Sequence, residues 1–394
     1  MFLTNWKAMH SGFISLVLIY FVTFAGEGLL IMYLFNSIRV NGLSIGISAL
    51  LALVSYLPSL VLTGVTLALH TRYSVRARMP LISIARALLC MSLVWTGSYL
   101  NIWVTLAFLA SMEILWYGLL PCLDELENKT IHSVGAGRGE AILTITLQLA
   151  LATSLLISGF LFDAYGAPIV LTCLAALQLL PAVLIPQASS IPKLKEGSAQ
   201  VVSAPKGKKE SGIVPLVFLL GVVSAIPQMV NILFPIKVFA VTDRSALAGV
   251  IDASYSVGAL GVAVIGLGAL LHSSSVRSTA VITMTLVTCS VAGFALSSAP
   301  PILVSAYFLL GFTVTLCRVR VRAAIFARLE GIGTSPWYSH LTSITLAFCV
   351  TGTILIGLVG LLAGLWSYLV IVVIAIAGIM AGLFIETEKI DQKE

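Results

Sequence analysis

The sequence predicts an all-α membrane protein of twelve transmembrane helices, arranged in two six-helix bundles with both termini in the cytoplasm. Three observations lead to this fold class. Hydrophobic residues make up 59% of the 394 positions and charged residues only 10%, whereas a soluble domain carries roughly a quarter charged residues. The apolar residues gather into about twelve segments near the roughly 20 residues that a crossing helix needs. The longest polar stretch, 187–212, falls near the midpoint of the chain.

Each long apolar run is predicted to cross as a helix, because hydrocarbon does not tolerate irregular backbone. In the first half, the expected helices are 11–35, 43–69, 79–98, 101–119, 139–162 and 167–186. In the second half, they are 213–239, 246–271, 279–297, 300–317, 337–362 and 366–385. The tight joins at Leu100 and at Pro300 and Pro301 are predicted to be helical hairpins. The long joins are expected at 120–138, 187–212 and 318–336.

The polar stretch at the midpoint divides the chain into two predicted domains. Residues 1–186 are expected to form the N-terminal bundle, and residues 213–394 the C-terminal bundle with a short cytoplasmic tail. The stretch 187–212 holds five Lys and two Pro, which is typical of a flexible basic linker, although one amphipathic surface helix is an alternative. Joins two and eight are both short and basic, and joins four and ten both long and charged. This correspondence favours the repeated halves of a secondary transporter.

The distribution of Lys and Arg predicts the orientation. With the N-terminus inside, 18 of the 22 Lys and Arg residues lie in inner loops, and only Arg39 and Arg244 lie in outer loops. Arg86 and Lys237 lie within or at the edge of apolar segments. The first apolar run is too long for the core of a cleavable signal peptide. We therefore expect a multi-pass protein of the bacterial inner (plasma) membrane with both termini cytoplasmic.

The sequence excludes several functional classes. Its six cysteines are scattered with no CxxC pair, so no metal site or disulfide framework is expected. It has no phosphate-binding GxxxxGK[ST] loop, no HExxH and no GxSxG, so we expect neither an enzyme nor a cofactor. The pI near 9.0 follows from topology and does not indicate nucleic-acid binding. A monomer is expected, whose partners are the lipid bilayer, a small-molecule substrate and protons.

Several short motifs resemble those of the major facilitator superfamily. The stretch Arg72-Tyr73-Ser74-Val75-Arg76-Ala77-Arg78, followed by Arg86-Ala87-Leu88, is similar to that family's basic turn after helix two and its helix-three arginine. Leu119-Leu120-Pro121 before Asp124-Glu125-Leu126, with Gly159 and Gly166, is similar to the drug-exporter branch that includes macrolide efflux proteins. The resemblance implies a cytoplasmic gate loop at Arg72, Arg76 and Arg78. Two departures weaken a carry-over of proton antiport: Thr71 stands where the family usually has Asp, and 153–159 lacks proline.

Ionisable residues inside predicted helices are the first functional candidates, because a charge in the bilayer should face a cavity or a partner. Glu27, Glu113 and Asp252 are the carboxylates that could couple transport to protons, and Arg86 is a further candidate for coupling or for the cavity. Each also has a structural interpretation. Glu27 could lock helices together, Glu113 could pair with Arg86, and Asp252 could pair with Lys237.

Polar and aromatic side chains supply further candidates for the walls of a cavity. Gln228 and Asn231 lie one turn apart beside Pro227, and polar amides near proline breaks line binding sites in transporters or hold helices together. Aromatic walls are expected from Tyr20, Trp116 and Tyr255, although such residues are also common anchors at the membrane interface.

Three functions follow from these patterns. The favoured one is a proton-coupled secondary transporter that exports a small antibiotic-like or amphipathic natural product, giving self-resistance or secretion. In it, the first, fourth, seventh and tenth helices line the path. An importer of a nutrient, siderophore or peptide-like solute has the same architecture. A membrane sensor or lipid-handling protein without transport is the third, and it predicts that Glu27 and Glu113 tolerate neutral isosteric replacement.

Overall fold

The computed structural model describes residues 11–56, 74–97, 101–130, 136–188, 213–266, 275–329, 334–362 and 364–385, and no strand occurs in these ranges. The first half contains α1 (Ser11–Val40), the helical segment Ile45–Tyr56, α3 (Val75–Thr96), α4 (Ile102–Thr130), α5 (Ala136–Tyr165) and α6 (Ala167–Ala188). The second half contains α7 (Ile213–Phe239), α8 (Ser245–Gly266), α10 (Val276–Leu296), α11 (Pro300–Leu329), α12 (Thr334–Leu362) and α13 (Gly364–Leu383).

These helices have the length and the surface of membrane-spanning elements. By length and composition, 10 helices of the described residues can cross a bilayer, and shorter apolar helices occur at Ile45–Tyr56 and Ile344–Gly360. Large apolar side chains on the outer surface are exposed, for example Leu81, Trp103 and Val183, as expected where lipid replaces water. The predicted class, an all-α membrane protein of twelve helices, is confirmed, and the chain is a multi-pass membrane protein.

Two helices extend by about three turns beyond their predicted inner ends. α4 continues past residue 119 to Thr130, and α11 past residue 317 to Leu329. The prediction of long joins at 120–138 and 318–336 was therefore wrong. The added turns of α4 carry charged residues, but Leu123 and Leu126 are buried in a cluster with Phe13 and Leu16 of α1. An extension with one apolar face gains this packing and stays helical. The predicted linker 187–212 lies outside the described residues except for the end of α6.

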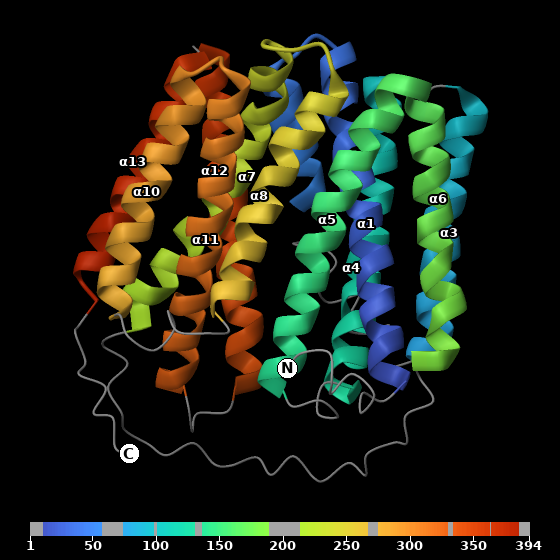
Figure 1. The fold of residues 1–394 in the computed structure, drawn as a ribbon, viewed down its shortest axis with the longest axis horizontal. Coiled ribbons are helices and arrows are strands. Elements are labelled where there is room, and N and C mark those ends of the chain that lie inside the picture. Colours follow the sequence, from blue (N-terminus) through green and yellow to red (C-terminus); the bar gives the residue numbers. More distant parts are fainter. Residues whose placement is uncertain are drawn as a thin grey trace.

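The helices form two groups in space (Figure 1). α1 and α3–α6 pack against one another, and so do α7, α8 and α10–α13. We call these the N-terminal group, which also includes Ile45–Tyr56, and the C-terminal group. They meet where α5 packs on α8, with further contacts of α1 with α7 and α8, and where Ile45 and Ala49 lie against the glycines Gly360 and Gly357 of α12. α1 begins and α13 ends at the lower end of Figure 1, which the charge distribution assigns to the cytoplasm; we call this the inner end.

The backbones of α5 and α8 touch at two glycines near the outer end. A Cβ atom on Gly159 would lie 2.5 Å from the carbonyl oxygen of Ser245, and one on Gly249 would lie 2.5 Å from that of Leu155. Small residues permit such close approach between membrane helices. The two groups are therefore in direct backbone contact at the outer end.

Candidate functional site

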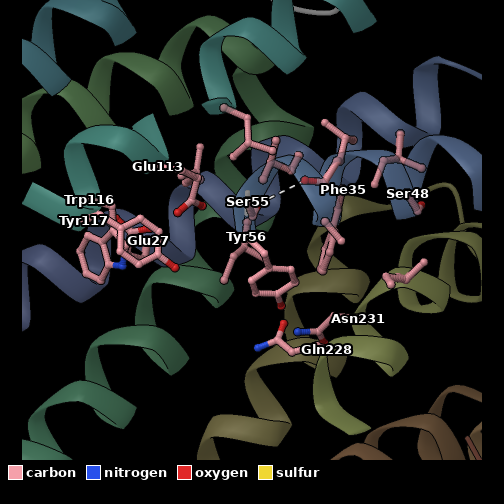
Figure 2. A pocket seen from close by; sticks show the side chains of 18 residues that line it. Glu27, Phe35, Ser48, Ser55, Tyr56, Glu113, Trp116, Tyr117, Gln228 and Asn231 are labelled. Carbon is pink, nitrogen blue, oxygen red and sulfur yellow. Dashed lines mark hydrogen bonds between the residues drawn. The ribbon is translucent and has the colours of Figure 1, made fainter. Parts of the chain in front are cut away.

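A cavity of about 340 Å³ lies between the two groups (Figure 2). The 18 described residues that line it come from α1, Ile45–Tyr56, α4 and α7. The volume is at the lower end of the roughly 300–1,000 Å³ typical of small-molecule sites. Most of the wall is apolar, and the polar and aromatic lining residues are Glu27, Phe35, Ser48, Ser55, Tyr56, Glu113, Trp116, Tyr117, Gln228 and Asn231.

Glu27 reaches the cavity from α1 and is paired with a buried arginine. The Nη2 atom of Arg86 donates to Oε1 of Glu27 at 2.5 Å, and the Arg86 side chain is 0% exposed. The Arg86 guanidinium also lies over the Trp116 ring, 5.1 Å from its centroid. Arg86 itself does not line the cavity. The charge of Glu27 is therefore balanced from behind the cavity wall.

Glu113 lines the same cavity from α4 without such a partner. The ion pairs found among the described residues are Arg86–Glu27 and Arg78–Glu125. The pair between Glu113 and Arg86, considered from sequence, does not form, because the Arg86 guanidinium is directed to α1. Figure 2 shows Glu113 on the same side of the cavity as Glu27, Trp116 and Tyr117. Glu113 is thus a cavity carboxylate that no described cation pairs with.

Gln228 and Asn231 line the cavity from α7, on the side away from the two carboxylates in Figure 2. The hydroxyl of Tyr307 on α11 donates to Oδ1 of Asn231 at 3.1 Å. The expected first, fourth and seventh helices therefore line the cavity as α1, α4 and α7. α11, expected as the tenth, contributes no lining residue and instead holds Asn231 from behind.

The helical segment Ile45–Tyr56 supplies lining residues that the sequence analysis did not single out. Ser48, Ala52, Ser55 and Tyr56 all face the cavity. They are spaced i, i+4, i+7 and i+8, which is one face of a helix. This run of small and polar residues on one face was the signal that could have found them.

Three predicted residues besides Arg86 do not line this cavity. Asp252 is 8% exposed on α8 and is not a lining residue, and the Nζ atom of Lys237 donates to the Ala295 carbonyl at 2.8 Å instead of pairing with it. Tyr255 packs against Tyr307, with ring centroids 6.1 Å apart. Tyr20 donates to Glu127 at 2.5 Å. A role for these three residues in transport therefore stays a prediction.

The predicted cytoplasmic gate loop is described only in part. Arg72 lies outside the described residues, and Arg76 and Arg78 begin α3. Nη2 of Arg78 contacts Oε2 of Glu125 on the α4 extension at 2.8 Å. This ion pair joins α3 to α4 within the N-terminal group, so a gating role for these arginines stays a prediction.

Hydrogen bonds join the two groups at the outer end, beyond the cavity. Asp163 on α5 accepts from the backbone N–H of Ser245 and of Ala246, at 2.8 Å each. These are the first two residues of α8, so the carboxylate caps that helix from the other group. The Ser245 hydroxyl also donates to Oδ1 of Asn36 on α1 at 2.7 Å.

A second set of contacts at this end involves the turn before α8. Nη1 of Arg39 donates to the Asp243 carbonyl at 2.5 Å, and its guanidinium lies over the Phe239 ring, 5.0 Å from the centroid. Below it, Phe35 stacks on Phe234 with centroids 4.9 Å apart. We call this outer set of contacts, together with those of Asp163 and Asn36, the outer closure.

Comparisons with known proteins bear on the fold. No protein-family model matches the sequence, and no curated protein matches it closely enough to count as a relative. Solved structures do match over nearly the whole chain. The nucleoside transporter NupG has a TM-score of 0.70 at 11% identity, covering 96% of this chain and 100% of its own.

Two further structures give similar values. A bacterial homologue of the iron transporter ferroportin, in an inward-facing state, has a TM-score of 0.69 at 12% identity, covering 94% of this chain and 98% of its own. A bacterial homologue of the human lysosomal transporter Spinster has 0.64 at 12% identity, covering 94% and 95%. The chain therefore has the fold of these transporters. At 11–12% sequence identity, the similarity shows the fold alone.

Proposed function

We propose that the chain is a secondary active transporter of the bacterial plasma membrane, which exports a small amphipathic or antibiotic-like compound in exchange for protons. The observation that carries this proposal is the cavity between the two helix groups, which is lined by two carboxylates and lies beneath the outer closure. Such carboxylates are expensive within a membrane and commonly mark solute or proton pathways. The fold shared with NupG and the other transporters supports the same interpretation.

In the proposed cycle, residues 1–186 and 213–394 move as two bundles that rock about the cavity. The outer closure holds the outer end shut while solute enters from the cytoplasm. Its hydrogen bonds then break, and the solute leaves on the outside. We assign the proton to Glu113, because it faces the cavity and is not held in an ion pair with a described residue. Proton and solute would occupy this carboxylate in turn, which gives exchange.

Reconstitution tests this proposal. The purified chain is placed in proteoliposomes that contain a pH-sensitive dye, and amphipathic antibiotics, nucleosides, siderophores and short peptides are offered in turn. We expect at least one amphipathic compound to drive proton movement in the direction opposite to its own, and Glu113→Gln to abolish that signal. Absence of any solute-dependent signal across the panel, from protein that remains folded, would count against a transporter and favour a sensor.

A further inference from the structure

We propose that the cavity selects an organic cation, namely a protonated amine or quaternary ammonium attached to an apolar body. This inference rests on the proposed transport function, whose solute class it names. It concerns equilibrium binding, however, and can be measured without any transport.

The charges around the cavity support a cation. Glu27 and Glu113 are the charged residues among the 18 described residues that line it, and both are acidic; these 18 include no Lys, Arg or His. Arg86 supplies one positive charge from behind the wall, and its ion pair is with Glu27. An anionic solute would meet two carboxylates in surroundings that screen charge poorly. A solute with one positive charge would complement the carboxylate of Glu113.

The aromatic side chains of the same wall point to the same class. Phe35, Tyr56, Trp116 and Tyr117 line the cavity, and aromatic faces attract cations through their quadrupoles. The Trp116 ring already holds the Arg86 guanidinium at 5.1 Å from its centroid. Rings beside a carboxylate can therefore surround an ammonium group and its hydrocarbon substituents.

The opposite wall indicates where the uncharged end of the solute lies. Gln228 and Asn231 face the cavity across from Glu27 and Glu113, with Tyr56 between them (Figure 2). Oδ1 of Asn231 accepts from Tyr307, so its amide N–H₂ group is oriented by a fixed partner. A hydrogen-bond acceptor on the solute, at the end away from the cation, would meet these two amides.

Three probes of similar shape test the charge preference. Benzyltrimethylammonium is cationic, benzyl methyl sulfone is neutral, and phenylmethanesulfonate is anionic. Binding of each to the purified full chain is measured by isothermal titration calorimetry. We expect the cation to bind about tenfold or more tightly than either of the others, since a desolvated cation–π contact alone contributes about this factor.

Substitutions in α4 test whether the preference for a cation arises at Glu113. Glu113→Gln should reduce the advantage of the cation by about tenfold, because the rings remain but the close charge pair is lost. Glu113→Asp, which keeps the charge, should retain most of it. Asp124→Asn is the matched control, because Asp124 is an exposed carboxylate further along α4 and outside the cavity. It should bind the three probes as the parent chain does. Gel filtration and thermal unfolding show whether each variant is folded.

Two outcomes overturn the inference. One is equal or tighter binding of the sulfone or the sulfonate, and the other is failure of all three probes to bind folded protein. The proposed function fails separately. If cations bind but no solute crosses the membrane in proteoliposomes, the proposed transport function is rejected and the cation site stands. If neutral or anionic solutes are transported and cations are not preferred, the cation site is rejected and the transport function stands.

Discussion

Arg86 of α3 donates to Glu27 of α1 at 2.5 Å, and the two partners differ in exposure. The Arg86 side chain is 0% exposed and that of Glu27 is 17% exposed. Arg86 is enclosed by protein, whereas Glu27 also faces the cavity. The loss of either partner should therefore have unequal consequences, because only the carboxylate can regain hydration.

Replacement of Glu27 by Leu should be the more damaging change. It leaves the Arg86 charge buried without an acceptor, and breaking a buried pair in this way costs about 3–5 kcal/mol. Arg86→Met should lower stability less, and the double variant Glu27→Leu with Arg86→Met should recover part of the loss. The midpoints of thermal unfolding in detergent give the order of stability of these variants. Equal losses in the two single variants, with no recovery in the double variant, would show that the pair is not the reason for their effects.

The outer closure predicts a shift between conformations in Asp163→Asn. The change removes the negative charge from the start of α8 and one of two good acceptors, and the loss of a helix cap costs about 1–2 kcal/mol. That is enough to change a two-state ratio by about 5–30-fold. Spin labels at Asn101→Cys and Ser298→Cys, both near the outer end, should report longer distances. Asp124→Asn is the control, and an unchanged distance distribution in Asp163→Asn would contradict a closing role.

Much of this fold could be predicted because long apolar runs fix the number of helices and the depth of each residue. Glu27, Glu113, Trp116, Gln228 and Asn231 were named from sequence, and the structure places all of them at the cavity. The depth of a residue in the membrane does not tell which way its side chain points around the helix axis. Helices that are apolar on all sides have no polar face to mark which residues point inward.

This missing rotational information explains most of the differences between the predicted and the observed positions of side chains. Asp252 and Tyr255 have suitable depths on α8, but neither lines the cavity. The sequence analysis considered only Glu113 as a partner of Arg86, and the pair with Glu27 was missed because the rotation of α3 was not known. Tyr20 was misplaced for another reason. Its partner Glu127 lies on the α4 extension, which hydropathy alone assigned to a loop.

The contact of α5 with α8 predicts that added side chains are poorly tolerated at Gly159. In Gly159→Ala the new methyl group would lie 2.5 Å from the Ser245 carbonyl oxygen, so the two backbones must separate. Gly293→Ala on α10 is the matched control, since its methyl group would make an ordinary contact at 3.8 Å with Ala306. The control should gain about 0.5–1 kcal/mol, as alanine does over glycine within a helix. The midpoint temperature of thermal unfolding should therefore fall in Gly159→Ala and stay the same or rise in Gly293→Ala. Equal midpoints in the two variants would mean that the close approach of α5 and α8 is not required.

Glu113→Gln should separate proton coupling from solute movement. Gln keeps the size and hydrogen-bonding capacity of the side chain but cannot carry the proton that we assign to this position. Accumulation of solute against its concentration gradient, driven by a pH gradient, should therefore be lost. The reason is that the variant no longer carries a proton in exchange for the solute. Exchange of labelled for unlabelled solute at equal pH on both sides needs only that the loaded cavity reorients, so it should persist. If the solute is a cation, loss of the charge pair with Glu113 should lower its affinity by about tenfold. Both are measured in the same proteoliposomes. Loss of accumulation and of exchange alike would place Glu113 in solute binding alone, and retention of both would move the coupling proton to another carboxylate, for which Glu27 and Asp252 are the next variants to make.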